Sequence, residues 1–173
     1  MVKYRKATKE DFDDIINFHN RLKDNDRTYE EFIWEFEKGP FGPALYIIAE
    51  TDGKIIGTNC IIPIEFVFSN GQTIFTGKSE DTLVDPEYRG QKIFYRIYEK
   101  LFEESEKIGI KLIWGFTSAY KPFFNLGFEI PYEHVQAISV NHVMNSYKYL
   151  SKLNVKNGFA DKMKILGLCI LAK

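Results

Sequence analysis

The spacing of apolar residues changes along the chain and predicts alternating strands and helices. Residues 2–7 alternate between polar and apolar types, which is typical of an edge strand. Two stretches, 12–22 and 32–36, then place apolar residues at helical spacing. Thr8 precedes the first as a cap, and Thr28 begins a capping box before the second.

The middle of the chain predicts an antiparallel meander. Residues 44–50 and 54–68 read as strands joined by Asp52-Gly53, a dipeptide typical of tight hairpins. Asn70-Gly71 makes a second hairpin into a strand over residues 73–84.

Helical spacing returns over residues 90–108, and the helix ends at a glycine. Residues 110–116 then read as a buried strand, 118–126 as a short helix and 128–140 as a further strand. The stretch after 140 is compatible with a helix or with a covering segment.

This order of elements predicts a mixed α/β (α+β) single domain over residues 1–140, with a mostly antiparallel sheet and helices on both faces. The strand–helix–strand crossover within 73–116 places its two strands side by side and parallel. Residues 141–173 form a C-terminal extension that ends inside an apolar run. That ending suggests a homodimer interface or a missing C-terminal domain.

Composition narrows the class of protein. The chain has 173 residues, 23 basic and 24 acidic side chains and a net charge of −1, so no basic stripe marks a nucleic-acid binder. Its two cysteines and three histidines show no metal-ligand spacing, and we expect no metal. The apolar tract 165–172 is too short to span a bilayer, and no signal peptide is visible. We therefore expect a cytoplasmic protein that does not enter a membrane.

The segment 83–93 carries the most informative chemistry. Pro86 ends a strand and a helix begins near Gly90, whose small size permits close approach of a ligand to the backbone. The first amides of a helix lack internal partners and carry partial positive charge, which suits a diphosphate. Arg89 and Lys92 add charge. The alternative is an ordinary turn with two solvated basic side chains.

Two segments resemble motifs of one known family. Residues 84–91, V-D-P-E-Y-R-G-Q, resemble the acetyl-CoA-binding motif V-x-P-x-x-R-G-x-G-I-G of the GNAT N-acetyltransferases. Residues 119–128, A-Y-K-P-F-F-N-L-G-F, resemble the second family motif, A-x-x-F-Y-E-K-L-G-F. The resemblance covers residues 2–140, and the order of elements also matches.

The resemblance implies an acyl-CoA-dependent N-acyltransferase that moves an acetyl group from acetyl-CoA to a primary amine of a small molecule. It implies that the parallel strand pair splays around acyl-CoA, with backbone amides on the first strand pairing with the pantetheine arm. The implied cofactor-binding residues are Leu83, Val84, Arg89, Gly90, Gln91, Lys92, Ile93, Phe94 and Phe123.

Three departures from the family motifs affect these residues. Lys92 stands where the family has its second glycine, and Phe94 stands where it has a small residue. Phe94 would either crowd the diphosphate or pack inward. Phe123 aligns with the family tyrosine that protonates the departing thiolate, and phenylalanine cannot donate a proton. Tyr120, one turn earlier, is the substitute candidate, with a packing aromatic as the alternative.

The resemblance also places a catalytic carboxylate at Glu80, which would take the proton from the attacking amine. The alternative is a glutamate on a solvated strand face, and Glu65 is a weaker candidate for the base. Two further functions stay open: a catalytically silent module that binds a CoA thioester or a protein, and an enzyme that uses a longer acyl donor. The sequence does not identify the amine.

Overall fold

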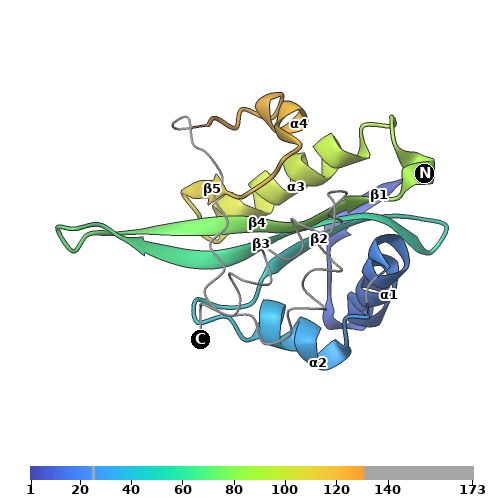
Figure 1. Cartoon of the computed structure of the whole chain (residues 1–173), viewed down its shortest axis with the longest axis horizontal. Helices are drawn as coiled ribbons and strands as arrows, with labels where there is room; N and C mark the ends of the chain where they lie inside the picture. Colours follow the sequence, from blue (N-terminus) through green and yellow to red (C-terminus); the bar gives the residue numbers. More distant parts are fainter. Residues whose placement is uncertain (25, 131–173) are drawn as a thin grey trace, which may run out of the picture. The chain divides into compact units, whose positions relative to one another are not determined.

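The computed structural model describes residues 1–24 and 26–130, and residues Met1–Glu129 form one compact unit. Its centre is a five-stranded sheet in the order β1-β2-β3-β4-β5 (Figure 1). Neighbouring strands are antiparallel except β4 and β5, which are parallel. The predicted mixed sheet is therefore confirmed. The strands are β1 (Lys3–Lys6), β2 (Leu45–Thr51), β3 (Lys54–Val67), β4 (Thr73–Val84) and β5 (Leu112–Trp114).

Helices cover both faces of the sheet (Figure 1). One face carries α1 (Phe12–Lys23), α2 (Tyr29–Phe32) and the π-helical turn η2 (Ile33–Glu37), whereas the other carries α3 (Ile93–Lys107) and α4 (Tyr120–Phe124). Two short 3-10 turns, η1 (Lys9–Asp11) and η3 (Pro86–Tyr88), precede α1 and α3.

Each face of the sheet packs its own apolar core. The α3 side buries aliphatic residues of the sheet and helix with Tyr98, while the α1 side is aromatic and includes Phe12, Phe32 and Phe36. Burial of one such side chain stabilises the fold by about 1.5–3 kcal/mol. The two cores hold the sheet rigidly between its helices.

The predicted turns and caps form as their residue types dictate. Asp52 and Gly53 have φ angles of 50° and 72°, the left-handed pair that a tight hairpin requires. The Thr28 hydroxyl accepts from the Glu31 amide at 3.2 Å, and the Glu31 carboxylate accepts from the Thr28 amide at 2.8 Å. The capping box at the start of α2 is thus confirmed.

Several boundaries differ from the sequence prediction, and the helix predicted over 118–126 is limited to α4. The helix predicted from residue 90 begins at Ile93, because Gly90 and Lys92 have left-handed backbones with φ of 78° and 60°. The strand predicted over 110–116 shrinks to β5, since the amide of Ile110 donates to the Ser105 carbonyl at the end of α3.

Residues 128–130, predicted as strand, have no regular structure, and the Phe128 amide donates to the Phe123 carbonyl at the end of α4. The rest of that predicted strand lies outside the described residues, as does the predicted domain boundary at 140.

Helix length and side-chain spacing in the described residues bear on membrane and metal binding. None of the helices in that part of the chain has both the length and the hydropathy needed to cross a bilayer. The same residues contain no group of three or more His, Cys, Asp or Glu side chains arranged to hold a metal ion.

Candidate functional site

Strands β4 and β5 pair briefly and then part. Residues 76–78 pair with 112–114, and no further pairs join the two strands. At the point of separation the backbone is tight, because a Cβ on Gly115 would lie 3.2 Å from the Ser79 carbonyl oxygen. Beyond this point β4 runs on to Val84 with an edge that β5 does not cover, which exposes backbone hydrogen-bonding groups.

The direction of these groups follows from the next residue. The Asp85 amide donates to the Ile56 carbonyl of β3 at 2.9 Å. Because backbone groups alternate in direction along a strand, Leu83 faces β3 with its backbone and Val84 faces the open side. The free edge at Val84 is available to an extended ligand.

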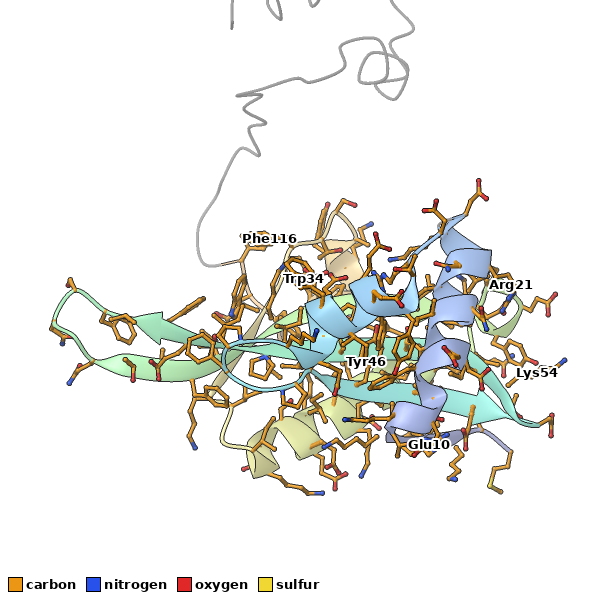
Figure 2. All side chains as sticks on the ribbon, turned by 90° about the horizontal axis from the view of Figure 1, so that it is seen from below. Glu10, Arg21, Trp34, Tyr46, Lys54 and Phe116 are labelled. Atoms are coloured by element: carbon orange, nitrogen blue, oxygen red, sulfur yellow. The ribbon has the colours of Figure 1, made fainter. Side chains whose placement is uncertain are left out.

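The turn after β4 is fixed by Asp85. Its carboxylate accepts from the Glu87 amide at 3.1 Å and caps η3. Arg21, at the far end of α1 from Glu10 (Figure 2), donates to the same carboxylate at 2.8 Å. The hydrogen bond from Arg21 lowers the pKa of Asp85, so the cap is charged at neutral pH.

A set of unpartnered amides lies at the start of α3. The first backbone hydrogen bond of this helix is donated by Arg96 to the Lys92 carbonyl at 3.1 Å. The amides of residues 90–95 find no acceptor among the residues that the structure describes. They lie at the positive end of the helix dipole, the arrangement that binds phosphate groups.

The surroundings of these amides are open and basic. A Cβ at Gly90 would meet no atom within 4 Å. Arg89, Gln91 and Lys92 are exposed, whereas Ile93 is buried in the core beside the sheet and anchors the helix start. The backbone is therefore approachable from outside, with two cations beside it.

Phe94 packs inward and away from this turn. Its ring lies 4.9 Å from the Tyr98 ring and 5.3 Å from the Phe123 ring, centre to centre. Tyr98 in turn hydrogen-bonds through its hydroxyl to Ser79 at 2.8 Å and to Thr82 at 3.3 Å. Tyr98 thus joins the predicted residues Phe94 and Phe123 to β4, although its only sequence signal was an apolar helical position.

The two predicted catalytic residues lie on separate elements. Glu80 is half-buried on β4, opposite Cys60 of β3, and forms an ion pair with Lys78 at 2.5 Å. Tyr120 begins α4, is 49% exposed, and stacks on Phe124 of the same helix. The weaker candidate, Glu65, lies opposite Phe75, farther along the hairpin.

A buried charge network surrounds the residue after Glu80. The Asp81 carboxylate accepts hydrogen bonds from Arg27 Nη1 at 2.5 Å, from Arg27 Nη2 at 3.2 Å and from the Tyr46 hydroxyl at 2.5 Å. His19 Nδ1 lies 3.7 Å away and Lys23 Nζ 4.0 Å away. Burial alone would raise the pKa of Asp81, but the hydrogen bonds from Arg27 and Tyr46 outweigh it, and the pKa is lowered.

His19 is a neutral member of this network. The Thr58 hydroxyl donates its one proton to the Asp81 carbonyl, so His19 Nε2 must donate to the Thr58 oxygen, 2.7 Å away. His19 Nδ1 therefore bears no proton and has no hydrogen-bond partner among the described residues. Burial lowers the pKa of His19 to about 4, which keeps the ring neutral near pH 7.

The outer rim of this network is formed by η2. Trp34 is 74% exposed and labelled in Figure 2, next in sequence to Glu35, whose carboxylate lies 3.6 Å from Arg27 Nη2. Burial raises the pKa of Glu35, and the charges of Asp81 and Glu80 add to this effect. A π-helical turn often marks a functional site.

The sequence of this chain matches the model of a known protein family. A sequence model described as "Acetyltransferase (GNAT) domain" matches residues 3–131. The chain belongs to the GNAT acetyltransferase family. The resemblance inferred from the two sequence motifs is confirmed. A search of curated protein sequences found no significant match.

Solved structures share the GNAT fold at low identity. Glucosamine-6-phosphate N-acetyltransferase from Arabidopsis thaliana is 22% identical with a TM-score of 0.62, over 80% of this chain and 98% of that chain. A predicted acetyltransferase from Clostridium acetobutylicum, solved with acetyl-CoA, is 21% identical with a TM-score of 0.61, over 80% and 96%. AAC(6')-Iy, solved with the bisubstrate analog CoA-S-monomethyl-acetylneamine, is 14% identical with a TM-score of 0.63, over 81% and 99%.

Membership in the GNAT family gives the backbone of the R-G-Q-K turn a physical meaning. The first two of the three glycine positions in the family motif are Gly90 and Lys92 in this chain, and both have positive φ. Glycine adopts such angles without steric cost, whereas lysine does not. At Lys92 this chain therefore has a backbone conformation that favours glycine, and it carries a cation there.

Proposed function

We propose that this GNAT chain is an acyl-CoA-dependent N-acyltransferase that moves an acetyl group from acetyl-CoA to a primary amine of a small molecule. The observation that carries the proposal is the run of unpartnered amides at residues 90–95, opening α3 beside the split between β4 and β5. These groups fit a diphosphate joined to an extended arm.

In this proposal the diphosphate lies on the amides of the R-G-Q-K turn, with Arg89 and Lys92 supplying charge. The pantetheine arm runs along the free edge of β4 at Val84, next to Leu83, in the manner of an added strand. Support comes from the acetyl-CoA bound by the Clostridium acetobutylicum protein and from the CoA analog bound by AAC(6')-Iy. Ile93, Phe94 and Phe123 form the apolar support behind it.

The chemistry is a direct attack. The nitrogen lone pair of the amine adds to the thioester carbonyl, and Glu80 takes a proton from that nitrogen, directly or through water. Backbone amides at the end of β4 polarise the carbonyl oxygen. The carbon–sulfur bond then breaks, and the departing thiolate takes a proton from Tyr120 or from water. The products are an amide and free CoA.

Two measurements test this proposal. Titration calorimetry with acetyl-CoA should show saturable binding, and a thiol-release assay over a panel of small amines should show turnover with at least one. Glu80→Gln should lower kcat by about 10²–10⁴-fold, the usual contribution of a general base, while the Kd for acetyl-CoA stays within about twofold. Absence of acetyl-CoA binding would refute the proposal.

A second candidate function is a catalytically silent GNAT module that binds a CoA thioester or a protein. Phe123 favours it, because its ring cannot donate a proton and is enclosed by Phe94, Tyr98 and Phe128. Binding of acetyl-CoA without thiol release from any amine would support this module. Release only with longer acyl-CoA would instead indicate an enzyme that uses a longer donor.

A further inference from the structure

The side chains of β4 do not alternate regularly between the two faces of the sheet. Ser79 and Thr82 both hydrogen-bond the Tyr98 hydroxyl and so face α3, although a regular strand would turn them to opposite faces. Asp81 faces the other side, where it meets Arg27. The strand therefore contains one extra residue between Ser79 and Thr82.

The backbone confirms a β-bulge at this point. Asp81 has a φ of 51°, and the pairing of β3 with β4 shifts register between Thr58 and Cys60. A left-handed residue inside a strand is strained when it carries a side chain. Something must hold Asp81 in this conformation.

Hydrogen bonds hold Asp81 from both its side chain and its main chain. Arg27 and Tyr46 grip the carboxylate, while the Thr58 hydroxyl donates to the Asp81 carbonyl at 2.9 Å. Figure 2 shows Tyr46 behind α1 and α2, toward the middle of the sheet. Arg27, Tyr46 and Thr58 thus form a clamp on Asp81, and Arg27 and Tyr46 hold it from the face of the sheet that α1 and α2 cover.

A second ion pair joins α1 to the residue that follows β4. Arg21 of α1 binds Asp85 at 2.8 Å, so the strand segment 81–85 is fixed at both of its ends. This segment contains Leu83 and Val84, which the proposed function places along the acyl donor.

We propose that Asp81 is a positioning residue, which fixes the Glu80 carboxylate relative to the main chain of residues 82–84. The inference rests on the proposed function, in which Glu80 takes a proton from an amine that attacks an acyl group held beside that main chain. A regular strand would move residues 82–84 by one position and turn their backbone groups over. The base and the acyl group would then no longer face the same amine.

The test uses two variants that loosen the clamp gently. Tyr46→Phe keeps the ring and removes one hydrogen bond, while Asp81→Asn keeps the shape and a tolerance for left-handed φ. Each should lower kcat about ten- to hundredfold, since small misplacements of reacting groups have effects of this size. The KM for acetyl-CoA should stay within about twofold, because the amides of residues 90–95 are untouched.

A matched control comes from Arg5 and Asp11, a second arginine–aspartate pair that is joined through two guanidinium nitrogens. Asp11→Asn weakens the bidentate contact with Arg5, whose two hydrogen bonds to Asp11 are both 2.7 Å. It should leave both kcat and KM unchanged. Equal losses of kcat in Asp11→Asn and Asp81→Asn would show a general effect on the fold and overturn the positioning role.

A double-variant cycle separates positioning from support of the fold. In a Glu80→Gln background, Tyr46→Phe should add no further loss of kcat, because the group that it positions is already gone. Losses that multiply would overturn the role of Asp81 while leaving Glu80 as the base. An unchanged kcat in Glu80→Gln alone would instead overturn the assignment of Glu80, and the positioning role with it.

Discussion

Two arginines of this chain each grip a carboxylate with two nitrogens, in very different surroundings. Arg5 binds Asp11 through two contacts of 2.7 Å and also binds Glu50 at 2.7 Å, which ties β1, η1 and β2 together. Arg27 binds Asp81 and ties the α1–α2 connection to β4. The chemistry of the two pairs is the same.

Their surroundings separate a pair that supports the fold from one beside a site. Asp11 has an ordinary right-handed backbone, and its side chain is 14% exposed. The Asp81 side chain is 6% exposed, its backbone is left-handed, and the nearby His19 Nδ1 lacks a partner in the described structure. Of the two aspartates, only Asp81 combines a strained backbone with a nearby buried atom that lacks a hydrogen-bond partner in the described structure. Such features cluster at functional sites.

The largest predicted effect breaks the buried pair. Arg27→Met leaves the Asp81 charge buried without its main partner and should lower the free energy of unfolding by about 3–5 kcal/mol. Arg5→Met should cost only about 1–2 kcal/mol, because water reaches Asp11 and Glu50. Urea unfolding followed by circular dichroism measures both. Adding Asp81→Asn to Arg27→Met should recover part of the loss, and equal costs for the two single variants would contradict the comparison.

The next effect is acid sensitivity from His19. The unfolded ring binds a proton below about pH 6.5, whereas burial beside Lys23 and Arg27 lowers the folded pKa to about 4 despite Asp81. The unfolded state therefore binds more protons between these values. The contribution of neutral His19 to the free energy of unfolding should be fully present above about pH 6.5. It should fall by about 3 kcal/mol as the pH drops to about 4.

Urea unfolding at a series of pH values measures this loss. In His19→Gln, which keeps a donor for Thr58, the slope between pH 6.5 and 4 should flatten. An unchanged slope in that variant would show that another group causes the loss.

The half-buried Arg5–Asp11 pair should lose its contribution to stability at lower pH. The Arg5 hydrogen bond lowers the pKa of Asp11 from 3.8 to about 2. The folded state holds this proton less tightly than the unfolded state, so the contribution is present above about pH 4. Because water screens this pair, about 1 kcal/mol should be lost as the pH falls toward 2. Acid unfolding of Asp11→Asn should lack this component, whereas a loss that persists in the variant would assign it elsewhere.

The sequence predicted those parts of the molecule whose cause is local. The Asp52-Gly53 hairpin, the Thr28 capping box and the parallel crossover each depend on residues close in the chain or on a handedness rule. The turn around Arg89 and Gly90 was also found, because strand end, proline and glycine follow one another. The roles of its side chains stay predictions.

The Asp81 network was missed because its partners are distant in sequence. Arg27 and Asp81 are 54 positions apart, and Arg27 lies in a polar stretch between two predicted helices, where nothing local marks a partner. Tyr46 lies at an ordinary strand position and His19 at an ordinary helix position, so neither stands out in the sequence. The available signal was a charged pair, Glu80 and Asp81, on a strand where one of the two must face a core, but nothing local indicates a bulge.

The smallest predicted effect concerns backbone strain, which hydrogen bonds from other side chains hold in place at Asp81 but not at Lys92 among the described residues. Lys92 and Asp81 both have left-handed backbones, at φ of 60° and 51°, yet Lys92 is exposed and has no clamp among the described residues. Lys92→Gly should therefore raise the free energy of unfolding by about 0.5–1 kcal/mol, since relief of strain exceeds the added freedom of the unfolded chain. Asp81→Gly should lower it, because the same relief comes with loss of the bonds to Arg27 and Tyr46. Lys92→Ala, which removes the side chain and keeps the strain, is the control, and a gain equal to that of Lys92→Gly would show that charge rather than backbone strain sets the effect.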